Sequence, residues 1–161
     1  MKELVLIRHA KSSWEYDVSD VKRPLKKRGL NDAALVSKAF KNAAFYPEKI
    51  FSSPARRAFD TCKIFMNTLD IDMSRVEIEE ELYDFGGQSV INFLKQLNDG
   101  YEKVMIFGHN HAFTSICNIF GDKFIDNLPT SGLVLINFDV STWKDIEKGK
   151  TILTIFPRDL K

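Results

Sequence analysis

The chain opens on an apolar run that passes directly into an arginine and a histidine, and this feature constrains the fold most strongly. Residues 4–7 are all aliphatic, and Arg8 and His9 follow before the small residue Ala10. An uninterrupted apolar run of this length is typical of a strand buried on both faces of a parallel sheet. Because ligands of open α/β sheets bind at the carboxyl ends of the strands, Arg8 and His9 are predicted to border a binding crevice.

The composition favours one globular domain spanning residues 1–161. Hydrophobic residues make up 44% of the 161 residues, which is enough for a sizeable core. The formal net charge of +1 argues against nucleic acid as a partner, since that binding depends on clustered positive charge. The first apolar run is too short for a signal peptide and no segment reaches the length of a membrane span, so we expect a cytoplasmic monomer with no membrane partner.

The two cysteines do not suggest a disulfide or a metal site. Cys62 and Cys117 both fall on apolar faces of predicted helices, where a cysteine usually serves as a small buried side chain. No group of cysteines and histidines has the spacing of metal ligands. We therefore predict that neither cysteine takes part in the chemistry of the site.

Strands alternate with helices along the chain, which predicts an α/β fold with a largely parallel sheet. Residues 10–27 lack a period and are predicted to form a loop under which Trp14 packs, or from which Trp14, Tyr16 and Lys22 contact a partner. The predicted strands are 3–8, 50–51, 76–78, 103–107, 133–138 and 151–156, and the predicted helices are 31–44, 53–69 with Ser53 as N-cap and Pro54 at the first position, a short one after 86–87, and 112–120. The last two strands are joined without a helix and are predicted to be antiparallel.

Three segments share one design, in which a strand ends at a turn that carries arginine or histidine. They are Arg8-His9, the stretch from Ser53 to Arg57, and Gly108-His109-Asn110. If the three strands are parallel, these segments meet at one edge of the sheet and bring two histidines and at least two arginines together. Arginine forks and helix amino termini both favour phosphate. The arginines would repel a metal cation, so this set indicates phosphoryl transfer with His9 as nucleophile.

Each group then has an expected role. His9 must be neutral to attack phosphorus, and the neighbouring arginines disfavour its charged form. A protonated His109 could donate to a phosphoryl oxygen. The candidate substrate-binding residues are Arg8, Arg57, His109 and Asn110. The third histidine, His111, is expected to cap a helix or to face solvent.

These residues resemble the histidine phosphatase superfamily, which includes the phosphoglycerate mutases. The resemblance rests on Leu-Ile-Arg-His-Ala at residues 6–10, on Ser-Pro-x-x-Arg-Ala at 53–58 and on Gly-His-Asn at 108–110. Arg23-Pro24-Leu25 and the stretch 129–132 narrow it to the SixA-type phosphohistidine phosphatases. It covers nearly the whole chain, from Lys2 to about Pro157.

The resemblance implies a fold and a set of catalytic residues. The fold would be a three-layer α/β/α sandwich whose mostly parallel, mixed sheet has one antiparallel strand near the C-terminal edge. His9 matches the histidine that becomes phosphorylated, Arg8 the arginine beside it, and His109 the second histidine. Arg57 rather than Arg56 matches the second-motif arginine, because it stands three residues after Pro54. No metal or organic cofactor is implied.

One position departs from the superfamily pattern. Many members carry a glutamate three residues before an aromatic-glycine pair, where it protonates the leaving group. Here the pair is Phe85-Gly86, and the residue three before Phe85 is Leu82. Glu81 and Asp84 flank the gap as candidate proton donors, although an exposed acidic run is the more ordinary interpretation. A phosphorylated imidazole can leave without such an acid, whereas an alkoxide needs one.

The sequence therefore predicts a metal-independent phosphatase that works through a phosphohistidine intermediate. Its expected substrate is phosphohistidine on a signalling or phosphotransfer protein, because the short connections predict a shallow pocket open to a protein partner. Two alternatives stay open. One is a phosphatase for small phosphate monoesters, and the other is a non-catalytic module that binds a phosphorylated partner.

Overall fold

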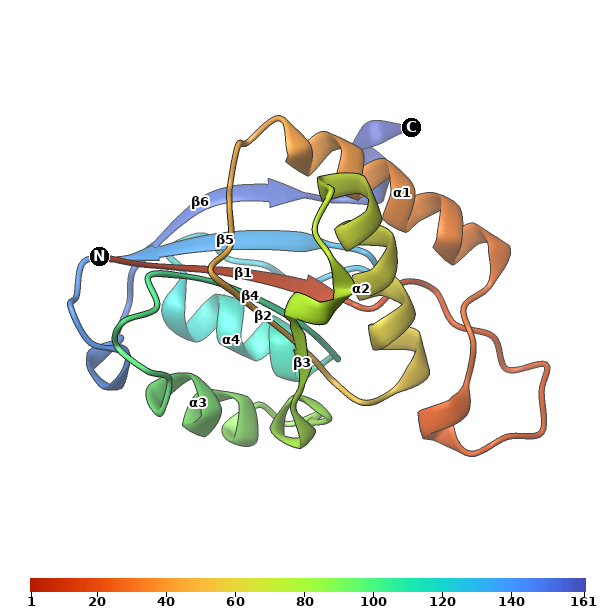
Figure 1. Ribbon diagram of the computed structural model, residues 1–161, viewed down its shortest axis with the longest axis horizontal. Helices are drawn as coiled ribbons and strands as arrows, with labels where there is room; N and C mark the ends of the chain where they lie inside the picture. Colours follow the sequence, from red (N-terminus) through yellow and green to blue (C-terminus); the bar gives the residue numbers. More distant parts are fainter.

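The computed structural model describes residues 1–161, and its centre is one six-stranded sheet. The strand order is β3-β2-β4-β1-β5-β6 (Figure 1). The strands are β1 (Lys2–Arg8), β2 (Lys49–Ser52), β3 (Val76–Ile78), β4 (Lys103–Gly108), β5 (Leu133–Phe138) and β6 (Lys150–Ile155). The strands β1, β2, β3 and β4 pair in parallel, whereas β5 is antiparallel to both β1 and β6. The predicted mixed sheet with one antiparallel strand is confirmed.

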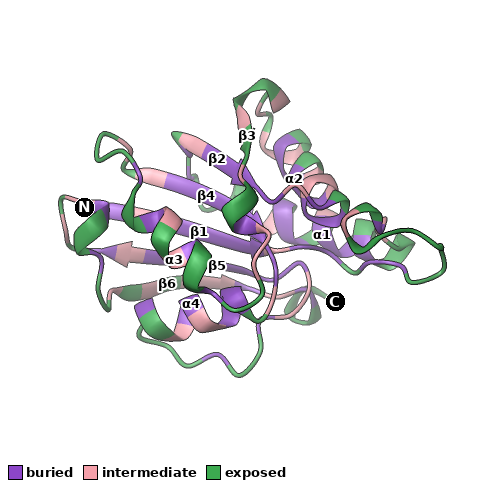
Figure 2. Cartoon of the chain, turned by 90° about the horizontal axis from the view of Figure 1, so that it is seen from below, coloured by how far each residue is buried: buried purple, intermediate pink, exposed green.

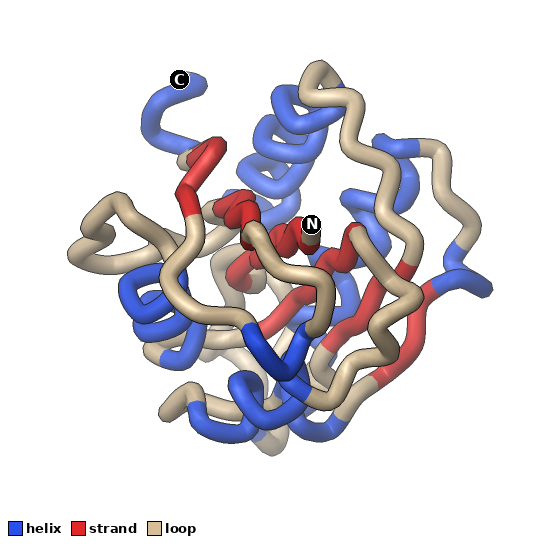
Figure 3. Tube along the Cα trace, turned by 90° about the vertical axis from the view of Figure 1, so that its left-hand side faces the viewer, coloured by secondary structure: helices blue, strands red, loops and turns tan.

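Helices cover both faces of this sheet and complete the predicted three layers (Figure 3). One face packs against α1 (Lys27–Lys41) and α2 (Arg56–Leu69), and the other against α3 (Gln88–Lys95) and α4 (Ala112–Phe120). Short 3-10 turns are η1 (Asp20–Lys22), η2 (Met73–Arg75), η3 (Glu80–Leu82), η4 (Trp143–Asp145) and η5 (Pro157–Leu160). No helix has the length and apolar character required to cross a membrane.

The alternation of side chains along β1 divides the core into two halves. Leu4 and Leu6 belong to the half under α3 and α4, and Val5 and Ile7 to the half under α1 and α2. All four are fully buried, as the uninterrupted apolar run predicted (Figure 2). The central position of β1 fixes Arg8 and His9 in the middle of one sheet edge rather than at its periphery.

The helix predicted at 31–44 is displaced towards the amino terminus, since α1 runs from Lys27 to Lys41. Pro24 ends the extended segment early enough for a helix to begin at Lys27, so the predicted start was four residues too late and the predicted loop was one residue too long. At the other end Ala44 has a φ of +52°, which is incompatible with a continued right-handed helix.

The second helix begins later than the Ser-Pro pair predicted. Its N-cap is Ala55, and Ser53 directly follows β2, where its N–H still donates to the Phe107 carbonyl of β4 at 3.0 Å. The hydroxyl of Ser53 accepts a hydrogen bond from the Ala55 N–H at 3.2 Å and also contacts His109. The prediction of Ser53 as N-cap was therefore wrong by two residues.

The burial predicted for the cysteines is confirmed. Cys62 on α2 and Cys117 on α4 are both fully buried, one in each half of the core. Burial raises the pKa of both thiols to about 12, so they stay protonated at neutral pH. A protonated buried thiol is a poor nucleophile, in keeping with a purely packing role.

Candidate active site

The three predicted strand exits meet at one edge of the sheet. Arg8 is in register with Gly108, and Ser52 is in register with Phe107. The residues that follow these strands are consequently neighbours, and the rings of His9 and His109 lie 5.2 Å apart between centroids. Arg57, in the first turn of α2, reaches the same place. We call His9, Arg57 and His109 the histidine–arginine cluster.

The hydrogen bonds of His9 fix its tautomer. Its Nδ1 lies 2.7 Å from the Ala10 carbonyl, which can only accept, so Nδ1 carries the proton. The Nε2 atom is then left with a lone pair, and the Arg57 Nε–H donates to it at 3.3 Å. Burial, helped by the charges of Arg57 and Arg8, lowers the pKa of His9 to about 3. The imidazole is therefore neutral at pH 7, which is the state that can attack phosphorus.

His109 is also neutral, and this changes the role expected for it. Burial, and then the proximity of His9 and Arg57, lowers its pKa to about 3, so the predicted protonated form is wrong for this structure. Its Nε2 lies 2.8 Å from the Ser53 hydroxyl. The Ser53 hydroxyl, which also accepts from the Ala55 N–H, has one proton that it can donate to Nε2, and in that arrangement the proton of His109 is on Nδ1. That buried Nδ1 has no hydrogen-bond partner.

The two adjacent arginines of α2 have opposite environments. Arg57 is 2% exposed, and its guanidinium contacts His9 and Asp20. Arg56 is exposed and pairs only with Asp60 one turn further along the helix. The spacing from Pro54 predicted Arg57 rather than Arg56 as the arginine of the site, and the structure places Arg57 beside His9.

Arg8 and Asn110 make different use of their polar groups. Burial lowers the pKa of Arg8; its Nη1 donates to the Leu128 carbonyl at 2.8 Å, and its Nε is buried without a partner. The Asn110 side chain accepts from the N–H and hydroxyl of Thr114 and donates to Asn127. Arg8 thus has a donor left for a ligand, whereas the Asn110 amide is used within the protein.

The two acidic residues on either side of Leu82, Glu81 and Asp84, do not contact the histidine–arginine cluster through hydrogen bonds. Leu82 is fully buried in the core, and Glu81 is exposed. The Asp84 carboxylate accepts from the backbone N–H groups of Gly87 at 3.0 Å and Val90 at 3.2 Å, at the amino end of α3. Neither acid makes a hydrogen bond to a member of the histidine–arginine cluster.

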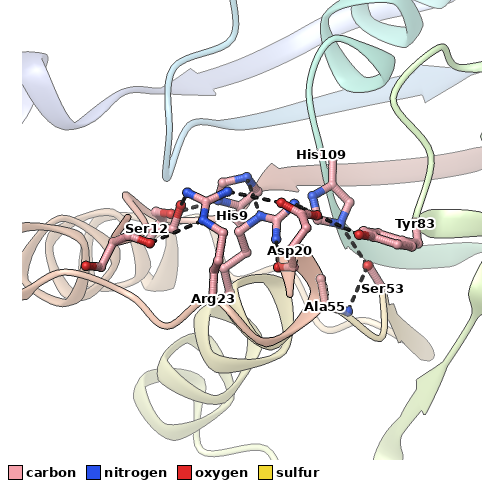
Figure 4. Close-up of polar contacts among 11 residues, drawn as sticks. His9, Ser12, Asp20, Arg23, Ser53, Ala55, Tyr83 and His109 are labelled. Carbon is pink, nitrogen blue, oxygen red and sulfur yellow. Dashed lines mark hydrogen bonds and ion pairs between the residues drawn. The ribbon is translucent and has the colours of Figure 1, made fainter. Parts of the chain in front are cut away.

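The carboxylate that does enter the site is Asp20, which the sequence reasoning missed. It lies on η1, within the segment between β1 and α1 that we call the connecting segment (residues 10–26). Its Oδ2 lies 2.9 Å from Arg57 Nη2 and 2.6 Å from the hydroxyl of Tyr83. Although partial burial alone would raise its pKa, the hydrogen bonds from Tyr83 and Arg57 lower it to about 2. Asp20 is therefore ionised at neutral pH, and Figure 4 shows its contact with Tyr83.

Two further residues complete the surroundings. Tyr83 packs its ring 5.3 Å from that of His109, and Arg23 donates to the Asp20 carboxylate at 3.2 Å. Arg23 also donates to the Ser12 hydroxyl and the Ser13 carbonyl, which folds the connecting segment on itself. No pattern of neighbouring residues predicts that Asp20 or Tyr83 belongs to the site, because only the tertiary fold brings them to the cluster. Arg23 stood in a quoted motif but without an assigned role.

Trp14 does not pack beneath the connecting segment as predicted. Its side chain is 76% exposed, and the Arg23 guanidinium stacks on its ring 3.3 Å from the centroid. Tyr16 is also exposed. The segment has too few residues facing the core to bury a tryptophan, since its inward positions are taken by Ser12, Ser13 and Arg23.

Two neutral histidines, the half-buried Arg8 and the buried Arg57 lie together at the carboxyl ends of parallel strands, an arrangement that favours a phosphoryl-type anion. A family model of the histidine phosphatase superfamily (branch 1) matches residues 4–89, which include His9 and Arg57. The chain belongs to the histidine phosphatase superfamily. Phosphatase activity is the class of function that this membership supports, and the resemblance drawn from the motifs is confirmed at that level.

Relatives and solved structures agree with this assignment. An uncharacterised chloroplastic protein of Arabidopsis thaliana is 27% identical over 155 residues, covering 89% of this chain and 70% of the relative. The structure of the protein histidine phosphatase SixA complexed with tungstate has a TM-score of 0.83 at 22% identity and covers 99% of both chains. A mycobacterial glucosyl-3-phosphoglycerate phosphatase has a TM-score of 0.66 at 12% identity, with 95% of this chain and 98% of that chain covered. These likenesses establish the fold.

Proposed function

We propose that this protein is a phosphatase in which His9 becomes transiently phosphorylated. The observation that carries the proposal is the tautomer of His9, whose Nδ1–H is held by the Ala10 carbonyl while Nε2 keeps its lone pair. The Nε2 atom attacks the phosphorus, the bond from phosphorus to the leaving group breaks, and a P–N bond to His9 forms. Water then attacks the phosphorus, which releases orthophosphate and restores neutral His9.

The remaining members of the site stabilise the transferred group. Arg57 and the free Nε of Arg8 donate to the phosphoryl oxygens, and the unpartnered Nδ1–H of His109 supplies a further donor. Positioned donors in a site closed to water account for most of the catalysis of phosphoryl transfer. The neutral state of His109 suits this role, because a neutral imidazole still donates one hydrogen bond.

We further propose that the substrate carries phosphorus bonded to nitrogen, as in phosphohistidine displayed on another protein. The site holds no carboxylic acid that is protonated and free to help an alkoxide leave, since Asp84 caps α3 and Asp20 has a pKa of about 2. An imidazole leaving group takes its proton from water near neutral pH and needs no such acid. The SixA likeness supports the same substrate class.

Rapid-quench labelling with a phosphorylated donor tests the nucleophile. We expect an acid-labile phosphoenzyme in the parent and in His111→Ala, a matched control on an exposed histidine, and none in His9→Ala. Labelling of His9→Ala at the parental level would exclude His9 as the nucleophile. If the parent protein never became labelled and the His9→Ala variant still bound phosphate, the results would instead favour a non-catalytic binding module.

A substrate panel at one pH tests the leaving group. We expect kcat/KM for a phosphohistidine peptide to exceed that for an unactivated sugar phosphate by about a hundredfold or more, the usual worth of a general acid that is missing here. Comparable values for the two substrates would contradict the preference for phosphorus–nitrogen bonds and favour the monoester phosphatase.

A further inference from the structure

The proposed nucleophile is nearly closed to solvent in this structure. His9 is 8% exposed, and His109 is fully buried. The connecting segment supplies one part of the cover through Asp20, and the chain after η3 supplies another through Tyr83. These two are joined by the hydrogen bond from the Tyr83 hydroxyl to the Asp20 carboxylate (Figure 4). Asp20 and Tyr83 are thus linked to each other beside the proposed nucleophile, and Asp20 is linked to His9 through Arg57.

Asp20 accepts hydrogen bonds from two nitrogens of Arg57 that face the site. The Nη2 of Arg57 donates to its carboxylate at 2.9 Å, and Nη1 donates to its backbone carbonyl at 2.7 Å. The third donor position of Arg57, Nε, is directed at His9 Nε2. Each nitrogen of this guanidinium thus makes one hydrogen bond, which uses three of its five N–H groups, and the Nε–H is directed at the lone pair that the proposed reaction uses.

We propose that Asp20 is an internal anionic ligand of Arg57, which an incoming phosphoryl group displaces and which thereby sets the anion affinity of the site. The proposal rests on the proposed function in one respect, namely that Arg57 binds the phosphoryl group. When Asp20 leaves, Arg57 can turn its donors from the carboxylate and from His9 Nε2 to the phosphoryl oxygens. Asp20 is then a positioning residue, because it acts through Arg57.

The local structure suits a ligand that leaves. The Asp20 side chain is 43% exposed, and η1 has no buried residue and no side-chain cap. A phosphoryl dianion brings more charge and more acceptor oxygens to Arg57 than a carboxylate does. A singly charged anion has no such advantage over Asp20. Asp20 consequently lowers the affinity of the site for every anion, and it lowers the affinity for singly charged anions more than the affinity for dianions.

Calorimetric titration of the full chain with orthophosphate tests this inference. Asp20→Asn removes the competing charge, and we expect it to tighten phosphate binding by about tenfold, roughly the value of one charged hydrogen bond. The matched control is Asp17→Asn, which removes the same charge from an exposed residue of the same segment that has no hydrogen bond. We expect phosphate binding by this control to stay within about twofold of the parent. Unchanged or weaker binding in Asp20→Asn would overturn the proposal.

A second variant and a second readout separate displacement from proton transfer. Tyr83→Phe removes one of the hydrogen bonds that hold Asp20, so it should tighten phosphate binding in the same direction by a smaller factor. Asp20→Asn should change KM for a phosphorylated substrate by a larger factor than it changes kcat. A loss of kcat of about a hundredfold with unchanged phosphate affinity would instead make Asp20 a proton-transfer group and overturn its role as a ligand.

These results are independent of the nucleophile. If Asp20→Asn tightened phosphate binding while His9→Ala kept its phosphoenzyme, the proposed mechanism would fail and the inference about Asp20 would stand. If phosphate binding did not respond to Asp20→Asn while labelling required His9, only the inference about Asp20 would fail.

Discussion

The histidine–arginine cluster and the connecting segment face each other across the same site, yet they are built in different ways. The cluster lies at the ends of β1 and β4 and in the first turn of α2, and its three side chains are at most 8% exposed. The connecting segment carries two exposed aromatic side chains and reaches the cluster through Asp20. The cluster is positioned by the sheet. The connecting segment is closed on itself by a short antiparallel bridge between Ser12 and Leu25, and it contacts the cluster through the hydrogen bonds between Asp20 and Arg57.

This difference indicates that the cluster is the rigid part of the site and that the connecting segment is the adaptable part. Backbone pairing of the buried strands β1 and β4 positions His9 and His109. Contacts made by partly exposed side chains are weaker, since solvent competes for them. A cover held in this way can open while the chemistry beneath it stays in place. The following expectations test the comparison, beginning with the largest effect.

The strongest test compares two neighbouring arginines. Arg57→Ala should lower kcat/KM by about a thousandfold or more, the scale of an arginine that stabilises a transferring phosphoryl group. Arg56→Ala should change kcat/KM by less than about twofold, since an exposed ion pair contributes little. Steady-state kinetics of both variants, checked for folding by circular dichroism, provide the comparison. Equal losses would mean that burial beside His9 does not identify the functional arginine.

Acid should destabilise the cluster before it affects the exposed groups. The pKa of both buried histidines is lowered to about 3, whereas an unfolded histidine binds a proton near pH 6.5. Their contribution to the free energy of unfolding is therefore complete above pH 6.5 and is lost as pH falls towards 3. We expect a loss of about 1–2 kcal/mol per histidine between pH 6.5 and about pH 5.

Urea unfolding at several pH values measures this slope. His109→Gln should reduce it by about half, and His111→Gln, on an exposed residue, should leave it unchanged. Measurements above about pH 5 exclude any contribution from Asp20, which titrates only at much lower pH. A stability that is flat from pH 7 to about pH 5 would show that the two histidines are not desolvated in the folded protein.

The junction between the connecting segment and α1 depends on a glycine. A Cβ atom on Gly29 would lie 2.3 Å from the carbonyl oxygen of Lys11 and 2.8 Å from its nitrogen. Gly29→Ala should therefore lower the free energy of unfolding by about 1–3 kcal/mol, the usual cost of overpacking. Gly86→Ala is the control, because its Cβ would meet only the Asp84 side chain at 4.0 Å. Equal stability of the two variants in denaturant would show that the junction is loose.

The smallest effect is expected at Trp14. Loss of its stacking on Arg23 should cost about 0.5–1 kcal/mol, as for other exposed cation–π pairs. The fully buried Trp143 offers the contrast, since truncation of a buried aromatic costs about 3–5 kcal/mol. Thermal or urea unfolding of Trp14→Ala and Trp143→Ala gives both values. A large loss at Trp14 would mean that the connecting segment is packed as tightly as the sheet.

Much of the cluster could be predicted from local patterns. The apolar run before Arg8, the similar run before His109 and the position of Arg57 after Pro54 all lie within a few residues of the groups that they place. Parallel pairing then brings the strand ends together in only one way. The start of α2 was misplaced because the Ser53–Phe107 backbone bond, a long-range contact, outweighs the capping preference of serine.

The sequence of residues 10–26 did not predict which of its side chains contact the cluster. Asp20 reaches Arg57 across 37 positions, and Tyr83 reaches Asp20 across 63, so neither contact leaves a trace in the neighbouring residues. The protonation of His109 was mispredicted for a related reason. Burial, which depends on the whole fold, disfavours the charged form of this imidazole.

The amino-acid sequence therefore established the α/β architecture, the strand exits and the histidine–arginine cluster, because hydrophobic periodicity and turn chemistry are local properties. The folded chain alone revealed that both histidines are neutral, that Ser53 orients His109, and that a carboxylate from a distant turn holds Arg57. Burial and long-range side-chain contacts depend on the entire structure. The protonation states and hydrogen bonds of the site therefore follow from the folded chain, whereas the residues of the cluster follow from the sequence.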